Sequence, residues 1–462
     1  MGVFEIMKMQ TINHSGYINL KSGKHIAYDF LDGYLNIHAA ENISELDGQQ
    51  VFLTENYDGK KYLFYSQIPI RISGIPIYPH NYRYYSDCAI ENYQAKSVYT
   101  KAVFRFDELQ HFCPSFMMAT ESSDDQVLFI MKPEVVKSFD VLIEGKECKV
   151  QFVIKSSKTT ESACRMESFS EIFVEFDETN DFEFLKTIYM MVKYAFAFIC
   201  NRKNIACNSM KLVGTYPSKT NNYGKIVDTI CTCCSELYFF DKYDASPENG
   251  KIIQKTSNVR GFLKHIDKLF QMIAVDLSRI KENNDLASIS ITSIHPSVHK
   301  RNLIDLQQSL QITAAFEFYV NRYLPPIIEE KEYHKIVKDS LDHLIELQTG
   351  KAKKLLKSLR KHIGDVSLAD KIIAAYEGFD GWESLKPCLS EVWFQDSDIE
   401  ALANAANDWR NELAHEKREY QPNRDTVYAV RFVEHLNYAI VLRQLGYEDI
   451  EIKALLEYAL TR

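Results

Sequence analysis

The feature that most constrains the fold of this 462-residue sequence is a change of pattern near residue 300. Before it, apolar residues occur in short runs rich in β-branched and aromatic side chains, such as "FDVLIEGKECKVQFVIK" (139–155), which are typical of strands. After it, apolar residues recur every three or four positions, which is typical of amphipathic helices. One chain therefore builds two kinds of core, and we expect an α+β multidomain protein.

The first part, residues 1–178, is predicted to be an antiparallel β-rich domain, either a sandwich or a barrel. "YDFLDGYLNI" and "ENYDGKKYLF" each place Asp-Gly between apolar runs, and Gly145 lies between two further strands, so hairpins are expected at all three positions. Residues 179–298 are predicted to be a mixed α/β segment of the same sensing or regulatory region. Helices are expected there at 184–200 and 259–282, with a loop-rich stretch between them that includes "TYPSKTNNYGK".

The last part, residues 299–462, is predicted to be an all-α bundle of ordinary domain size. Breaks at Pro and Gly divide it into helices. The expected helices cover 302–323, 326–347, 351–363, 367–376, 397–417, 424–445 and 447–461.

Composition narrows the class of protein. The net charge of −9 excludes a chain coated in basic residues, although a local basic site remains compatible with it. The ten Cys are scattered and several lie in apolar runs, which favours reduced thiols. The most apolar stretch, 184–200, contains Lys186 and Lys193, so it is predicted to be a buried helix and not a membrane span. We expect a cytoplasmic protein with no membrane association.

One helix, "DIEALANAANDWRNELAHEKRE" (398–419), combines an apolar stripe with an amide-rich polar face. The stripe consists of Ile399, Leu402, Ala406, Trp409 and Leu413. The polar face consists of Asn404, Asn407, Asp408, Asn411 and His415. Asn411 and His415 are four residues apart and therefore neighbours on the helix surface, and Arg410 flanks them.

Two interpretations of this polar face compete. Pattern alone favours a solvated surface, where Arg, Asn and Glu are common. The face is, however, rich in amides and low in charge, unlike the usual mixture of Lys and Glu. Arg, His and an amide are also what phosphodiester chemistry without a metal needs, since His moves a proton near neutral pH and Arg meets charge on phosphate oxygens.

The segment "RNELAH" (410–415) resembles the motif of HEPN-domain ribonucleases, in which an Arg is followed after four to six residues by a His. As in the common form of that motif, a polar residue follows the Arg, and the segment lies on a late helix of a helical bundle. A long β-rich region before such a bundle is similar to the ApeA-type abortive-infection proteins of bacterial phage defence. Outside the motif this likeness concerns the arrangement of domains.

The resemblance implies an endoribonuclease that needs no cofactor or metal. The 2′-hydroxyl of the RNA attacks the adjacent phosphate and leaves a 2′,3′-cyclic phosphate and a 5′-hydroxyl. His415 would then act as general base or acid, Arg410 would stabilise the phosphate, and Asn411 would position it. The family implies a homodimer with a composite site. It further implies tRNA or another cellular RNA as substrate, and a phage-derived trigger.

Basic residues near the motif are candidates for binding the RNA backbone. One group lies on the amphipathic helix "GKAKKLLKSLRKHIG" and consists of Lys353, Lys354, Lys357, Arg360 and Lys361. A second group follows the motif and consists of Lys417, Arg418 and Arg424. A solvated helix face is the alternative explanation for the first group.

Other candidates for chemistry are weaker. Cys207, Cys231, Cys233 and Cys234 lack the paired spacing of a zinc site, so we expect no metal there. Glu317, within an apolar helix, is expected to pair with Arg410 or with another Lys or Arg. Two other functions stay open. The first is a non-catalytic HEPN-type dimerisation or RNA-binding module, or a toxin–antitoxin component. The second is a carbohydrate-binding or hydrolytic role of the β-rich region.

Overall fold

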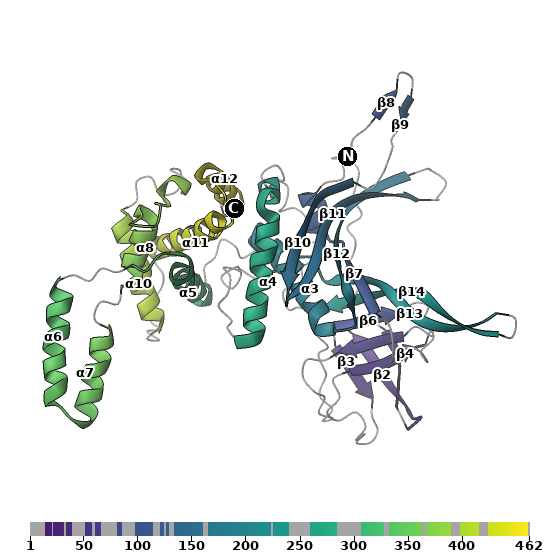
Figure 1. Cartoon of the computed structure of the whole chain (residues 1–462), viewed down its shortest axis with the longest axis horizontal. Coiled ribbons are helices and arrows are strands. Elements are labelled where there is room, and N and C mark those ends of the chain that lie inside the picture. The colour runs from purple at the N-terminus through teal and green to yellow at the C-terminus, as the bar shows by residue number, and fades with distance from the viewer. Residues whose placement is uncertain are drawn as a thin grey trace. The chain divides into compact units, whose positions relative to one another are not determined.

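The chain forms two compact units, Met1–Asn284 with His295–Lys300 and Asp285–Ile294 with Arg301–Arg462. Figure 1 shows the computed structural model, in which strands dominate the first unit and helices the second. The structure describes residues 14–20, 22–31, 34–38, 51–57, 61–65, 81–85, 98–113, 121–123, 126–128, 134–159, 165–222, 225–239, 259–283, 306–327, 332–362, 366–389, 398–414 and 424–460.

Unit 1 is built on one antiparallel sheet of twelve strands in the order β10-β11-β12-β7-β13-β14-β6-β5-β4-β1-β2-β3. Its strands are β1 (His14–Asn19), β2 (His25–Leu31), β3 (Tyr34–His38), β4 (Val51–Asn56), β5 (Lys61–Tyr65), β6 (Asn81–Tyr85), β7 (Val98–Phe104), β10 (Glu134–Ile143), β11 (Lys146–Thr159), β12 (Arg165–Thr179), β13 (Ser209–Asn222) and β14 (Lys225–Phe239). A separate two-stranded sheet consists of β8 (Glu121–Ser123) and β9 (Gln126–Leu128). The prediction of an antiparallel β-rich N-terminal region is confirmed, and the described strands form an open sheet with β10 and β3 at its edges.

The hairpins predicted from Asp-Gly and Gly145 are confirmed, since β2 pairs with β3, β4 with β5 and β10 with β11. Glu144 and Gly145 both have positive φ, 50° and 78°, as the tight turn of a two-residue hairpin requires. The expectation of a loop-rich stretch around "TYPSKTNNYGK" was wrong. This segment belongs to β13 and to the start of β14, which pair from Ser209–Tyr238 to Asn222–Lys225. Pro217 lies within β13 opposite Ile230 of β14, beyond Thr215, where the pairing of β13 with β7 ends. β13 pairs on one side only at that position, as at the edge of a sheet, where Pro is tolerated.

Within the described ranges of unit 1, four helical segments accompany the sheet: α2 (Asp107–Phe112), α3 (Phe182–Cys200), η4 (Val259–His265) and α4 (Ile266–Asn283). α3 packs against α4, and α4 packs against β10. Phe196 of α3 stacks edge-on against Phe106 and Phe112, and Phe152 of β11 contacts Phe112 and Phe270 of α4. This aromatic cluster joins the helices to the sheet.

The apolar stretch 184–200 is a buried helix, as predicted. Lys193 is only 2% exposed, and its ammonium group donates a hydrogen bond to the hydroxyl of Tyr189 at 3.1 Å. The carboxylate of Asp181 caps the start of α3 by accepting from the backbone N–H groups of Glu183 and Phe184. No helix in the part of the chain that the structure describes is long and apolar enough to cross a membrane.

Unit 2 contains each of the seven helices predicted for the C-terminal region. They are α5 (Leu306–Tyr323), α6 (Glu332–Leu347), α7 (Gly350–His362), α8 (Leu368–Glu377), α10 (Ile399–Ala414), α11 (Arg424–Gln444) and α12 (Asp449–Leu460), with the short 3-10 helix η7 (Lys386–Cys388) between α8 and α10. Ser367 and Asp370 form a capping box at the start of α8. The prediction of an all-α C-terminal region is confirmed.

α11 is the centre of this bundle. Every residue from Phe432 to Leu442 is buried, and α11 packs against α5, α10, α12 and α8. A helix that is buried on all sides needs partners for its polar side chains. The amide of Asn437, fully buried, donates a hydrogen bond to the backbone carbonyl of Ile312 in α5 at 3.0 Å. Glu434 pairs with Arg431 at 2.6 Å.

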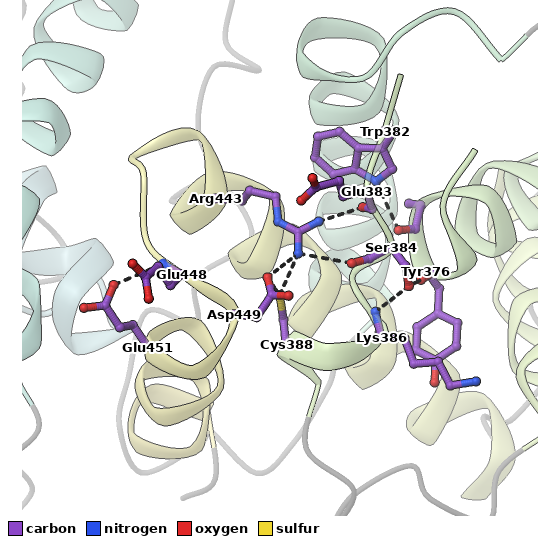
Figure 2. A network of polar contacts seen from close by, with 11 residues as sticks. Tyr376, Trp382, Glu383, Ser384, Lys386, Cys388, Arg443, Glu448, Asp449 and Glu451 are labelled. Atoms are coloured by element: carbon purple, nitrogen blue, oxygen red, sulfur yellow. Dashed lines mark hydrogen bonds and ion pairs between the residues drawn. The ribbon is translucent and has the colours of Figure 1, made fainter. Parts of the chain in front are cut away.

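A network around Arg443 fastens the end of α11 to α12 and to the segment before α10 (Figure 2). The guanidinium group donates to the backbone carbonyls of Glu383 and Ser384 at 2.6 and 3.1 Å and pairs with the carboxylate of Asp449. It also lies 3.1 Å from the sulfur of Cys388, whose thiol donates to Asp449 at 3.1 Å. One side chain thus connects three parts of the chain.

The ionisation of this network follows from burial and from its hydrogen bonds. Burial, and then the hydrogen bond to Asp449, raise the pKa of the Cys388 thiol to about 12, so Cys388 is a protonated donor at neutral pH. Partial burial pushes the pKa of Asp449 upward, but hydrogen bonds from Cys388 and Arg443 together with the charge of Arg443 outweigh it. The pKa of Asp449 therefore lies below its ordinary value.

The stabilisation that Asp449 provides should depend on pH. Because its pKa is lower in the folded protein than in the unfolded chain, this stabilisation is present above the unfolded value of about 3.9 and is lost as the pH falls through the folded value. We expect Asp449→Asn to lower the free energy of unfolding at pH 7, and the difference from wild type to shrink below about pH 4. Urea denaturation at several pH values measures this difference, and a difference that grows in acid would contradict the assignment.

Candidate active site

The helix that carries the "RNELAH" segment, α10, is held by its apolar stripe. Leu402, Ala403, Ala406 and Trp409 are each at most 8% exposed, and α10 packs against α11, α8 and α5. The stripe predicted from the sequence is thus confirmed for Leu402, Ala406 and Trp409, while Ile399 and Leu413 are half-buried. Ala403 was not predicted to belong to it. The burial of this side fixes which residues of α10 face outward.

The predicted polar face is only partly solvated. Asn404 and Asp408 are exposed, whereas Asn407 and Asn411 are half-buried. The amide of Asn407 lies 3.4 Å from the carboxylate of Asp408. An ordinary solvated helix would expose the whole polar face. Here two of the described polar side chains are exposed and two are half-buried, so the face is not simply a solvated surface.

Arg410 is directed toward α5. Its guanidinium group forms an ion pair with the carboxylate of Glu317, with 3.0 Å between Nη2 and Oε2, and donates to the side-chain oxygen of Asn411 at 3.2 Å. The Arg410 side chain remains 39% exposed, so it is fixed in position and still accessible. The structure therefore brings two of the predicted catalytic residues, Arg410 and Asn411, into direct contact.

Glu317 connects three helices. In addition to Arg410 on α10, its other carboxylate oxygen lies 3.8 Å from the ammonium group of Lys371 on α8. The sequence left open whether Glu317 pairs with Arg410 or with another cation, and the structure shows both pairs. Lys371 was not identified from the sequence, because a single Lys on an amphipathic helix carries no pattern that relates it to a motif 39 residues later.

The remaining part of the predicted site lies outside the described residues. These residues end at Ala414 in α10 and resume at Arg424 in α11. His415, Lys417 and Arg418 fall in this interval, so the expected contact between Asn411 and His415 stays a prediction.

A cavity of about 610 Å³ lies between α10 and the start of α11. Arg424 contributes to its wall, together with Trp409 and Tyr428. Four carboxylates share this wall: Asp398, Asp408, Glu412 and Asp425. In the sequence Arg424 follows two basic residues, but in the structure it lies beside these four carboxylates. Their negative charge weakens the attraction between Arg424 and a phosphate.

The basic residues of α7 lie on a separate helical pair. Lys354 and Lys357 are exposed and Lys353 is half-buried. Arg360 is exposed and donates a hydrogen bond to Asp342 of α6 at 2.6 Å, which raises the pKa of its guanidinium. The side chain of Lys361 lies outside the described residues. Among the described elements α7 packs against α6 and makes no comparable contact with α10, so the structure does not bring these residues and Arg410 into one site.

Of the four cysteines singled out in the sequence, only the side chain of Cys207 is among the described ones, so the prediction that the four hold no metal stays a prediction. Cys207 is buried just before β13, and Cys231, Cys233 and Cys234 belong to β14. Within the ranges that the structure describes, no group of three or more His, Cys, Asp or Glu side chains is placed to hold a metal ion.

Comparison with known proteins identifies the helical region. Residues 310–450, which extend from α5 into α12 and contain the whole "RNELAH" segment, match the family described as Apea-like HEPN. This helical region therefore matches an Apea-like HEPN domain, the class that the motif led us to expect. No curated protein and no solved structure matches the chain.

The ion pair of Arg410 should stabilise the fold only weakly. Both partners are partly exposed, and such pairs contribute about 0.2–1 kcal/mol. We expect a double-mutant cycle with Glu317→Gln and Arg410→Met to give a coupling in this range, measured as the free energy of unfolding by urea denaturation. A coupling above about 2 kcal/mol would mean that the pair is a main support of the bundle.

Proposed function

We propose that the chain is a metal-independent endoribonuclease whose active site is built on α10. The observation that carries this proposal is the match to the Apea-like HEPN family over residues 310–450, which include Arg410 and His415 in the spacing of the HEPN ribonuclease motif. The contact between Arg410 and Asn411 supports it, since the two residues that would meet the phosphate lie together on an accessible part of α10.

The reaction needs a proton transfer at each end of the scissile bond. A base removes the proton of the 2′-hydroxyl, whose oxygen then attacks the adjacent phosphorus. The bond from phosphorus to the 5′-oxygen breaks, and this oxygen receives a proton. The products are a 2′,3′-cyclic phosphate and a 5′-hydroxyl. We assign one of these proton transfers to His415, because His exchanges a proton near neutral pH.

Arg410 would stabilise the charge that develops on the phosphate oxygens. Glu317 neutralises part of its charge, but Lys371 also contacts Glu317, so these three side chains together keep one net positive charge. A phosphate therefore meets a guanidinium group that is already oriented. Asn411 would hold the Arg410 side chain and position the phosphate.

The biological role that we propose is antiviral. The enzyme would act in abortive infection, cleaving tRNA or another cellular RNA after a phage-derived trigger acts on the β-rich unit. A homodimer would form a composite site from two copies of the segment "RNELAH". These assignments rest on the likeness to ApeA-type proteins.

The alternative is a non-catalytic HEPN module that only dimerises or binds RNA, including a component of a toxin–antitoxin pair. The specific observation in its favour is the pairing of Arg410 with Glu317, since a guanidinium group engaged by a carboxylate can serve a purely structural role. The two functions differ in whether RNA is cut.

Cleavage should depend on Arg410 and His415. We expect wild-type protein to arrest growth and to generate RNA fragments with 5′-hydroxyl ends when the trigger is supplied. His415→Ala and Arg410→Ala should lower the cleavage rate by at least about 100-fold, since each removes a proton transfer or a charge contact in the transition state. Primer extension together with labelling of 5′-hydroxyl ends measures the products.

Matched controls come from exposed residues of the same types. His343→Ala on α6 and Arg279→Ala on α4 should leave cleavage unchanged, because both positions are exposed and lie outside the motif. Activity that disappears with EDTA would rule out the metal-independent mechanism. Equal behaviour of wild type and the two site variants would favour the non-catalytic module.

The exposed lysines of α7 should contribute to binding of RNA. Lys354→Gln with Lys357→Gln removes two cations, so the affinity should fall for all sequences alike. The slope of the logarithm of affinity against the logarithm of salt should decrease by about 1–2 in a filter-binding titration. Lys268→Gln with Lys211→Gln, at exposed positions of unit 1, is the control. An unchanged slope would mean that the basic face of α7 is an ordinary solvated surface that does not contact RNA.

A further inference from the structure

The last four strands of the twelve-stranded sheet, in the order β4-β1-β2-β3, have one buried face and one face that is open to solvent (Figure 1). The buried face holds side chains that are at most 6% exposed, namely Ile18, Ile26, Tyr28 and Phe30. Alternate residues of the same strands point the opposite way and form the outer face. Apart from Ala27, its described side chains are polar or aromatic: Ser15, Tyr17, Asn19, His25, Asp29, Asn36, His38 and Glu55, with Tyr57 just after β4.

Two tyrosines form an exposed aromatic pair on the outer face. Tyr17 is 41% exposed and Tyr57 is 65% exposed, and their rings meet edge to face with 5.1 Å between the centroids. A hydrogen bond between the two side chains raises the pKa of Tyr57, so its hydroxyl group stays protonated. Single exposed apolar side chains are ordinary, but two tyrosines that hold one another in place offer a rigid contact surface at little cost in conformational entropy.

A carboxylate on the same face is oriented by its neighbours. Asp29 accepts hydrogen bonds from the side chain of Ser15 and from Nε2 of His38, the latter at 2.6 Å. These bonds outweigh the opposing effect of burial and lower the pKa of Asp29, so the group is ionised at neutral pH. An ionised carboxylate has about four acceptor positions, so about two remain for a ligand.

Ala27 lies between these groups. Tyr17 is directly opposite it on β1, and His38 is directly opposite it on β3. His25 and Asp29 lie two residues away in either direction along β2, which corresponds to about 6.7 Å. Because Ala has the shortest side chain of the outer face, longer side chains surround it on four sides. A ring-shaped ligand placed over Ala27 can therefore contact Tyr17 and Asp29 at the same time.

The charge of the outer face disfavours a nucleic acid. The strands β1, β2, β3 and β4 contain no Lys and no Arg. They contribute the carboxylates of Asp29 and Glu55 to the outer face. Lys61 of the neighbouring strand β5 lies opposite Glu55, and Lys24 lies in the turn between β1 and β2. A phosphate backbone over Ala27 would thus meet the carboxylate of Asp29 without a strand cation to bind it.

The hydrogen-bonding groups favour a hydroxylated ligand over a cation. An ammonium group only donates hydrogen bonds, and Asp29 alone would suit it. The outer face also supplies donors. The side-chain oxygen of Asn19 accepts from Nδ1 of His25 at 2.6 Å, and the NH2 group of Asn19 adds two N–H donors. A hydroxyl group both donates and accepts, so a ligand with several hydroxyl groups matches both kinds of partner.

We propose that the outer face of β1–β4 binds a neutral oligosaccharide. The C–H groups on one side of a sugar ring carry a partial positive charge and pack against the negative face of an aromatic ring, here Tyr17 or Tyr57. Hydroxyl groups at the edge of the sugar ring donate to Asp29 and accept from Asn19. The sequence left a carbohydrate-binding role of the β-rich region open without naming a residue, and the structure supplies these residues. None of them belongs to α10, so the proposal does not rest on the ribonuclease.

Affinity electrophoresis of the full chain tests the proposal. We expect native gels that contain dextran, mannan, hydroxyethyl cellulose or soluble starch to retard the wild type in at least one case. The dependence of mobility on polysaccharide concentration gives a dissociation constant. Tyr17→Ala with Tyr57→Ala should raise this constant by at least about 10-fold, because both ring contacts are lost. Tyr428→Ala, at an exposed Tyr of unit 2, is the control and should leave it unchanged.

Asp29→Asn tests the polar part of the site without removing a ring. The substitution keeps the shape of a partly exposed side chain, so the fold should persist, which urea denaturation checks. We expect the dissociation constant to rise about 5-fold, since hydrogen bonds to a charged acceptor are stronger than those to a neutral one. Asp140→Asn, at an exposed position of β10, removes the same charge and should have no effect.

Three results would overturn the proposal. The first is a wild type that none of the four polysaccharides retards at about 10 mM sugar units, since a site of millimolar affinity would then be filled. The second is retardation that persists unchanged in the Tyr17→Ala, Tyr57→Ala variant, because another surface would cause it. The third is binding of oligouridine or of spermidine that this variant loses, without retardation by any polysaccharide. None of these measurements involves cleavage of RNA, so their outcome leaves the ribonuclease proposal unaffected.

Discussion

The burial of α11 is the constraint on which the helical unit depends. A helix with every residue from Phe432 to Leu442 buried is stable only when other helices surround it. α5, α10 and α12 do so, and the hydrogen bond from Asn437 to the carbonyl of Ile312 fixes α5 at the level of α11. α5 in turn carries Glu317, so the packing around α11 decides where the partner of Arg410 lies.

The candidate site is therefore a consequence of packing between helices that are distant in the chain. α5 contributes the carboxylate, α8 an ammonium group and α10 the guanidinium group and its amide neighbour. The Arg443 network supports the same unit from its other end, because it joins the last turn of α11 to α12 and to the segment that precedes α10. The ion pair of Arg410 is partly exposed and weak by itself, but it orients the guanidinium group.

Much of the fold was predictable because its signals are local. Helical periodicity and Pro or Gly breaks gave all seven helices of unit 2, and Asp-Gly pairs gave the hairpins β2–β3 and β4–β5. The β13–β14 hairpin was mistaken for loops, since Pro217 and the polar residues near it resemble a turn. Those residues pair within the hairpin, while its other end pairs with the distant strands β7 and β6. The choice between sandwich and barrel required the same long-range pairing. The described strands form an open sheet instead of a closed barrel.

The sequence by itself determined that the C-terminal region is helical, because periodicity along each helix is sufficient for that. The motif was singled out by its resemblance to HEPN ribonucleases, and the match over residues 310–450 agrees with that class. Only the tertiary structure decided that Arg410 is held by Glu317 and that Lys371 shares this carboxylate. It also decided that Arg424 lies in an acidic cavity wall and that the apolar stripes of α6 and α7 stay exposed. These contacts join residues that are far apart in the chain, so no local pattern could predict them. An amphipathic pattern predicts which face of a helix is apolar, but it does not predict which element packs against that face.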